Sequence, residues 1–162
     1  MLIQHILHRK GGEVETIPAT ATVADAVARL RDRNIGALVV TDEPGEEPGE
    51  EPGDETGDDA GTAGAIAGIL SERDIVRALA GSKAPLDQPV RELMTTEVTT
   101  CGARATVDEL MRLMTDRRIR HIPVVEGGRL VGIVSIGDVV KSRIDELQAE
   151  TETLHEYLSS GR

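Results

Sequence analysis

The sequence has almost no aromatic residues and a single cysteine. It contains no Trp and no Phe, and Tyr157 is its only tyrosine. Proteins that bind single-stranded nucleic acids stack bases on aromatic side chains, so this composition disfavours that class. Because Cys101 is alone, an intramolecular disulfide and a metal site built from several cysteines are both excluded. A core without Phe or Trp must be built from Val, Ile, Leu, Met and Ala.

Long apolar runs are also missing. No stretch approaches the ~18 consecutive apolar residues of a transmembrane helix, and residues 1–10 lack the apolar region of a secretory signal. The sequence therefore predicts a cytoplasmic protein without membrane contact. Its 162 residues are enough for one domain or two small ones.

Basic residues are absent from one segment, residues 42–64, which holds 10 acidic residues. The whole chain has 29 acidic and 18 basic residues, so the other 139 residues carry 19 acidic and 18 basic residues and are nearly neutral. This gives no bulk attraction to nucleic acid. The segment repeats Pro-Gly and acidic pairs every four residues, which predicts a disordered, solvated linker. A Ca²⁺ site or an arm for a basic partner is the alternative, although a flexible repeat does not fix Ca²⁺ ligands.

The chain contains an internal duplication. Thr22–Ile35 aligns with Thr106–Ile119 at an offset of 84, and Gly68–Val76 aligns with Gly132–Val140 at an offset of 64. The first copy therefore carries an insertion of 20 residues, which falls inside the acidic segment.

Each copy is predicted as strand, helix, strand, strand, helix. Apolar residues at i, i+3, i+4 and i+7 predict a helix after Thr22 and another after Thr106, and both threonines are good N-caps. Glu126-Gly-Gly128 predicts a short hairpin turn in the second copy, at the position where the acidic segment interrupts the first. A short N-terminal helix would place His5 and His8 three residues apart, but no third metal ligand is evident nearby, so we expect no metal site.

The duplicated unit resembles the cystathionine-β-synthase (CBS) domain, and two in tandem resemble a CBS pair. The motifs that carry the resemblance are Gly68-Ile-Leu-Ser71-Glu-Arg-Asp74, Gly132-Ile-Val-Ser135-Ile-Gly-Asp138 and Ile119–Val125. The resemblance implies an α+β fold of two tandem β-α-β-β-α units packed with pseudo-two-fold symmetry. It also implies a module that binds adenosine nucleotides (AMP, ATP, NAD(H) or S-adenosylmethionine) between its units and regulates another protein.

The repeated Ser-x-x-Asp is the candidate ligand site. Ser71 and Ser135 each end a strand and open a helix, where free backbone N–H groups and the helix dipole attract a phosphate. Asp74 and Asp138 lie one turn along the helix, where a carboxylate can accept both hydroxyls of a ribose. The alternative is that Ser-x-x-Asp is only a capping box.

The two copies differ in cationic residues. The resemblance implies basic groups for a phosphate at the start of the strand that follows the first helix. The second copy has Arg120 and His121 there, whereas the first copy has Gly36 and Ala37, so we expect unequal sites. The alternative is that the arginines form a solvated basic rim. The resemblance also implies that adenine lies against the first strand of each copy. With the offset of 84, the adenine-facing positions are Thr16, Ile17, Thr100 and Cys101. Cys101 is also expected to be a small core residue.

The last helix should extend to about Leu158, past the end of a CBS unit. Val140, Ile144, Leu147, Thr151, Leu154 and Leu158 follow heptad spacing, with charged residues on the other faces. Such a stripe needs a partner, so we expect a homodimer through this helix, or a helix that lies back on its own domain.

The sequence thus predicts a first CBS unit at residues 1–81, a second at 82–145, and a C-terminal helix and tail at 146–162. The predicted function is that of a non-enzymatic nucleotide sensor acting on an unknown partner. The alternative is a ligand-free module that dimerises or tethers a partner through its C-terminal helix. No nucleophile set, phosphate-binding loop or dinucleotide motif indicates catalysis.

Overall fold

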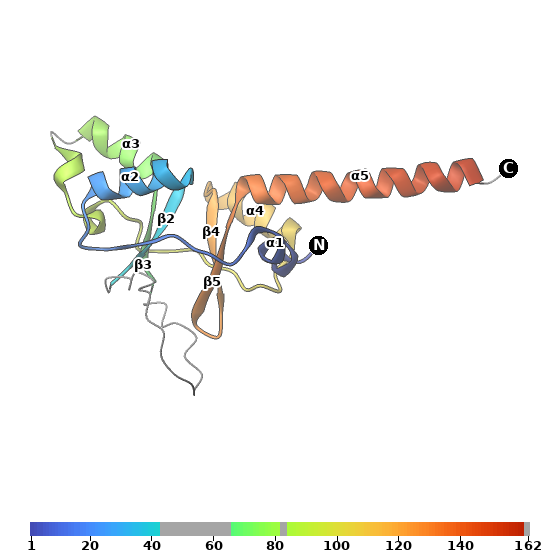
Figure 1. Ribbon diagram of the computed structural model, residues 1–162, viewed down its shortest axis with the longest axis horizontal. Coiled ribbons are helices and arrows are strands. Elements are labelled where there is room, and N and C mark those ends of the chain that lie inside the picture. The colour runs from blue at the N-terminus through green and yellow to red at the C-terminus, as the bar shows by residue number, and fades with distance from the viewer. Residues whose placement is uncertain (43–65, 82–83, 161–162) are drawn as a thin grey trace, which may run out of the picture. The chain divides into compact units, whose positions relative to one another are not determined.

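The computed structural model describes residues 1–42, 66–81 and 84–160, so the predicted linker lies outside the described residues except for Asp42. The chain divides into two compact units (Figure 1). The first-copy unit comprises Val14–Val98 and Gly127–Leu130, and the second-copy unit comprises Met1–Glu13, Thr99–Glu126 and Val131–Arg162. The N-terminal residues thus belong with the second copy of the repeat, whereas the boundary predicted at residue 81 follows the order of the copies in the sequence.

The first-copy unit is built on a three-stranded sheet. Its elements are β1 (Thr16–Pro18), α2 (Val23–Arg33), β2 (Ala37–Thr41), β3 (Ile66–Ser71), α3 (Glu72–Gly81) and the short 3₁₀ turns η1 (Pro85–Asp87) and η2 (Val90–Glu92). The strand order is β1-β2-β3; β1 is parallel to β2, and β2 is antiparallel to β3 with Ala37 opposite Ser71. The central strand, β2, is buried along its whole length.

The second-copy unit repeats this plan around a hairpin. Its elements are α1 (Ile3–Lys10), α4 (Val107–Arg117), β4 (His121–Glu126), β5 (Arg129–Ser135) and α5 (Ile136–Ser160). Gly127 and Gly128 both have positive φ and form the turn between β4 and β5, as predicted from the Gly-Gly pair. The strand expected at Thr100–Cys101 is reduced to one parallel bridge between Cys101 and Val124.

The helices begin where the sequence predicts. Thr22 caps α2 and Thr106 caps α4, each in a reciprocal capping box completed by Asp25 and Glu109 respectively. Both helices end in a left-handed residue at the same place in the repeat; these residues are Asn34 and Arg118.

Each unit has its own aliphatic core. The first-copy core includes Ile17, Leu38 and Leu70, and the second-copy core includes Leu110 and Ile122. Ile3 and Ile6 of α1 are buried in the second-copy core, which explains why residues 1–13 group with that unit.

Candidate functional site

The Ser71–Asp74 pair lies at the junction of β3 and α3. The backbone N–H of Ser71 donates to Asp74 Oδ2 at 2.8 Å, and the Ser71 hydroxyl donates to the same oxygen at 2.7 Å. Both side chains are half-buried. Within the described part of the chain, Asp74 Oδ1 accepts no hydrogen bond, so it can accept one from a ligand.

The Ser135–Asp138 pair has the same geometry at the junction of β5 and α5. The backbone N–H and the hydroxyl of Ser135 each donate to Asp138 Oδ2 at 2.8 Å, and the Asp138 N–H donates to Ser135 Oγ at 3.2 Å. The capping interaction is therefore present in both copies. Since it uses one carboxylate oxygen, the second oxygen has no hydrogen-bond partner among the described residues.

Asp138 has one more partner than Asp74. Lys10, the last residue of α1, donates to Asp138 Oδ2 at 2.7 Å and to the carbonyl of Ile133 at 3.2 Å. Burial raises the pKa of Asp138, but the hydrogen bonds from Lys10 and Ser135 outweigh this effect and hold the pKa below its ordinary value of 3.8. The carboxylate is consequently ionised at neutral pH and carries its own counter-ion.

The predicted phosphate-binding residues lie beside this junction. The Arg120 carbonyl accepts from the Ile136 N–H at 2.8 Å, which fixes the start of β4 next to the start of α5. Arg120 is exposed and His121 is half-buried. In the first copy, the Gly36 carbonyl accepts from the Glu72 N–H at 3.1 Å in the same way, but neither Gly36 nor its neighbour brings a cation.

The adenine-facing positions are placed less favourably. The Ile17 side chain is buried in the first-copy core, so only its backbone is available to a ligand, whereas Thr16 is half-buried. Thr100 is exposed, and Cys101 packs against the second-copy core as expected. Burial raises the pKa of the Cys101 thiol to about 11, so it stays protonated at neutral pH.

Lys10 was not indicated by any motif in the sequence. It lies outside the duplicated segments, and the residue that it contacts is 128 positions away. The predicted His5 and His8 are both exposed on α1. Across the described residues, no group of three or more His, Cys, Asp or Glu side chains is placed to hold a metal ion.

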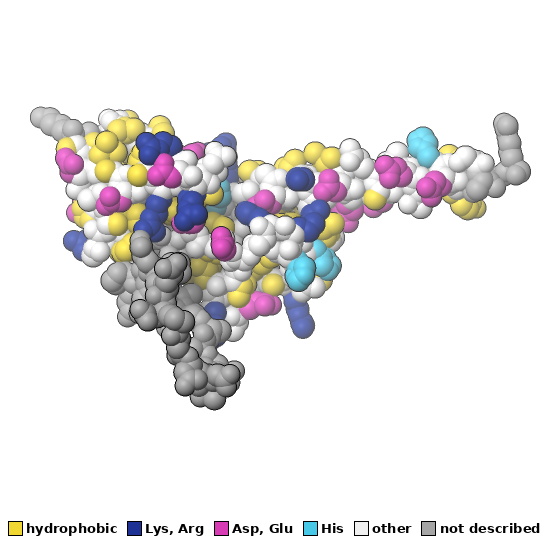
Figure 2. Space-filling model, in the orientation of Figure 1, with side chains coloured by type: hydrophobic (Ala, Val, Ile, Leu, Met, Phe, Trp, Pro, Cys, Tyr) yellow, Lys and Arg dark blue, Asp and Glu magenta, His cyan; other side chains and the backbone are white. Residues whose placement is uncertain are grey.

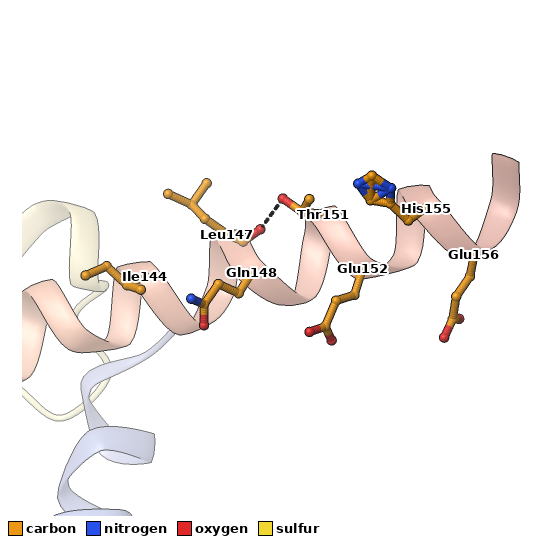
Figure 3. Close-up of a pocket in the computed structure, with 7 residues that line it drawn as sticks. All are labelled: Ile144, Leu147, Gln148, Thr151, Glu152, His155 and Glu156. Atoms are coloured by element: carbon orange, nitrogen blue, oxygen red, sulfur yellow. Dashed lines mark hydrogen bonds between the residues drawn. The ribbon is translucent and has the colours of Figure 1, made fainter. Parts of the chain in front are cut away.

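The second half of α5 forms a separate surface. Every described side chain from Leu147 to Ser159 is exposed, and this part of the helix extends away from the rest of its unit (Figure 1). Leu147, Thr151 and His155 lie along one side of the helix (Figure 3). Acidic side chains are spread along the same stretch (Figure 2). The described portion of the chain contains no helix with the length and hydropathy of a membrane span.

Two copies of one β-α-β-β-α unit, each with a Ser-x-x-Asp junction, define a tandem α+β repeat module. The chain belongs to the CBS domain family, which matches residues 5–48 and 90–145. It is similar to the mitochondrial CBS domain-containing protein CBSX3 of Arabidopsis thaliana, with 37% identity over 143 residues. The match covers 86% of this chain and 61% of that protein, so the chain spans about three fifths of this relative.

Solved structures share the fold over nearly the whole chain. The CBS-domain containing protein ATU1752 from Agrobacterium tumefaciens is 40% identical, with a TM-score of 0.74 over 88% of this chain and 99% of that one. The CBS domain pair of protein MJ0100, solved in complex with 5′-methylthioadenosine and S-adenosyl-L-methionine, is 26% identical. Its TM-score is 0.70 over 90% of this chain and 98% of that chain.

Proposed function

We propose that the protein is a regulatory module that binds adenosine nucleotides, with one Ser-x-x-Asp site in each unit, and passes the ligand state to a partner protein. The observation that carries this proposal is the repetition of one geometry at both strand–helix junctions. In each, the serine and the backbone hold one carboxylate oxygen, and the other oxygen has no partner among the described residues. The adenosine ligands of the MJ0100 pair support the same ligand class.

The arrangement suits a ribose and a phosphate. Asp74 Oδ1 and Asp138 Oδ1 are acceptors only, which matches the donor hydroxyls of a ribose. The serine hydroxyl now donates to the aspartate, and rotation about its C–O bond would redirect it to a phosphate. The helix N-terminus adds a favourable potential for an anion.

The proposal is tested by calorimetric titration of AMP, ATP, NAD(H) and S-adenosylmethionine. The double variant Asp74→Ala, Asp138→Ala should bind at least about tenfold more weakly, because each aspartate contributes charge-assisted hydrogen bonds of roughly 1.5–3 kcal/mol. Asp25→Ala is the matched control, since Asp25 completes a capping box on α2 outside the proposed sites. If none of the ligands binds below about millimolar, or if the double variant binds as tightly as the parent, nucleotide sensing is ruled out.

We also infer that two chains associate through α5. Leu147, Leu154 and Leu158 expose apolar side chains at heptad spacing, with Leu158 76% exposed. Two apolar side chains at equivalent positions of the repeat are also exposed: Val76 on α3 and Val140 on α5. A second candidate function rests on this surface alone: a dimerisation or tethering module that responds to no nucleotide. The cytoplasmic location and the absence of catalysis stay predictions of the sequence.

A further inference from the structure

Lys10 occupies a position that no repeat motif accounts for. Its ammonium group binds Asp138 Oδ2 at 2.7 Å and the Ile133 carbonyl at 3.2 Å, and the Lys10 side chain is 39% exposed. The cation therefore lies directly at the carboxylate proposed to bind ribose, with its charge open to solvent on one side.

In the first copy, the carbonyl equivalent to that of Ile133 has a hydrogen-bond donor that is not a cation. Ile69 is the counterpart of Ile133, and its carbonyl accepts from the backbone N–H of Thr95 at 2.9 Å. Within the described residues, Asp74 has no ion-pair partner. Arg77 does not distinguish the copies, because Lys141 is its counterpart in the second copy. Equivalent carbonyls thus receive a neutral amide in one unit and an ammonium group in the other.

The two copies differ not only in Lys10 but also in the residues at the start of the neighbouring strands, β4 and β2. Arg120 and His121 flank the second-copy junction, whereas Gly36 and Ala37 flank the first. A phosphate brought to Asp138 meets a carboxylate that is already neutralised. A phosphate brought to Asp74 meets a carboxylate without a counter-ion, and like charges at close range repel.

We propose that Lys10 is a phosphate-binding residue that makes the second-copy site selective for adenosine 5′-phosphates. The proposal rests on the proposed function. The flexible four-carbon stem of lysine lets the ammonium group turn from Asp138 to a phosphate. Asp138 Oδ1 then holds the ribose, and the backbone N–H of Ser135 keeps the carboxylate in place.

The test compares AMP with 5′-methylthioadenosine, which has the same adenosine but no charge. Asp74→Asn keeps the cap and removes the first-copy carboxylate, so calorimetry on this background reads the second-copy site. Adding Lys10→Gln should weaken AMP binding at least about tenfold and change 5′-methylthioadenosine binding less than threefold. Lys10→Arg, which keeps the charge, should retain AMP binding.

Arg9→Gln is the matched control. Arg9 is the neighbouring residue on α1 and also forms an ion pair with α5, to Asp145 at 3.2 Å, but it does not contact Asp138. Its removal should leave both affinities unchanged. Urea unfolding of the Lys10 and Arg9 variants shows whether either changes the stability of the unit.

The outcomes separate this inference from the function that it rests on. If the unmodified protein binds neither ligand, the proposed nucleotide function fails. If it binds both, but Lys10→Gln leaves AMP affinity within twofold, Lys10 is not a phosphate ligand and the function stands. An equal loss for both ligands would make Lys10 a support for the ribose carboxylate and would also overturn the selectivity.

Discussion

Two glycines at equivalent places in the repeat, Gly68 and Gly132, are required by what packs over them. A Cβ atom at Gly68 would lie 2.8 Å from the carbonyl oxygen of Thr95 and 2.7 Å from the Met94 sulfur. A Cβ atom at Gly132 would instead meet the Leu7 side chain, at 2.5 Å from Cδ2. The first contact involves backbone that is fixed by two hydrogen bonds to Ile69, and the second involves only a side chain.

We therefore expect Gly68→Ala to be the more damaging of the two substitutions. It should lower the free energy of unfolding by about 1–3 kcal/mol, as overpacking does in a close-packed interior. Gly132→Ala should cost less, because Leu7 can change rotamer. Urea unfolding of both variants measures the difference; equal losses would show that the Thr95 backbone moves freely.

The ionised Asp138 gives the protein a predictable response to acid. Because its pKa lies below the ordinary 3.8 in the folded protein, its contribution is complete above that pH. It is lost as the pH falls through the lower, folded-state value. Asp138→Asn should cost roughly 1–2 kcal/mol at pH 7, and the difference from the parent should disappear in strong acid.

Urea unfolding at pH 7, 4 and 2 tests this expectation. Asp145→Asn is the comparison, since its ion pair with Arg9 is exposed and such pairs contribute little. A gap between Asp138→Asn and the parent that stays constant with pH would contradict the ionised carboxylate.

For single residues, the sequence predicts contacts between residues that are close in the chain and does not predict contacts between distant ones. Spacing alone places Asp74 and Asp138 at their serines, because a capping box joins residues three apart. It could not find Lys10, whose partner is 128 positions away and whose segment is not repeated. The Ile17 side chain is buried in the core, so the prediction that Ile17 faces adenine now concerns its backbone.

The two halves of helix α5 differ in burial. Its first half packs on its own unit, where Ser142 and Val139 are buried, and Arg143 pairs with Glu146. From Leu147 to Ser159 every described side chain is exposed. An isolated helix of this length is marginal in water. No basic residue lies in the last turn of α5 to offset the helix dipole, so we expect a partner to stabilise this half.

We expect Leu147→Asp with Leu154→Asp to convert the proposed dimer to a monomer, because two carboxylates would replace apolar contacts in the stripe. Sedimentation velocity reports the change in mass, and circular dichroism reports the accompanying loss of helix. Ala149→Asp adds one such charge on the opposite side of the helix and should leave the proposed dimer intact. A double variant that sediments like the parent would exclude α5 as the interface.

Elements that depend on local chemistry were predicted well. The capped helices α2 and α4 and the Gly-Gly hairpin all follow from signals within a few residues of each other. The strand expected at Thr100–Cys101 was not found as a full strand, because its only ladder partner is a single bridge to Val124. Strand length depends on pairing between distant segments, which a short motif does not encode.

For the molecule as a whole, the compact units do not follow the order of the two copies. Residues 1–13 precede the first copy but bury Ile3 and Ile6 in the core of the second. The backbone N–H of Ile3 also donates to the Ala105 carbonyl at 2.9 Å. The repeat alignment could not show this, because α1 is outside the duplicated segments.

The burial of α1 in the second-copy core predicts which unit a core substitution in α1 will destabilise. Ile3→Ala should cost about 2–5 kcal/mol, since Ile3 is fully buried. The loss should appear in the second-copy unit, so amide hydrogen exchange should accelerate in α4 and β4 while β2 keeps its protection. Leu79→Ala, at an exposed position on α3 outside the α5 stripe, is the control. Faster exchange in β2 instead would place α1 with the first copy.

The division of the chain also sets an order of folding during synthesis. The first-copy unit lies almost entirely within Val14–Val98, so most of its contacts can form once residue 98 has left the ribosome. The apolar face of α1 emerges earlier, but its partners on α4 and β5 are made last. Closing the second-copy unit therefore brings together segments about 100 residues apart, a slow step by the usual dependence of folding rate on contact order. Until then Ile3 and Ile6 lack the core that buries them in the folded unit.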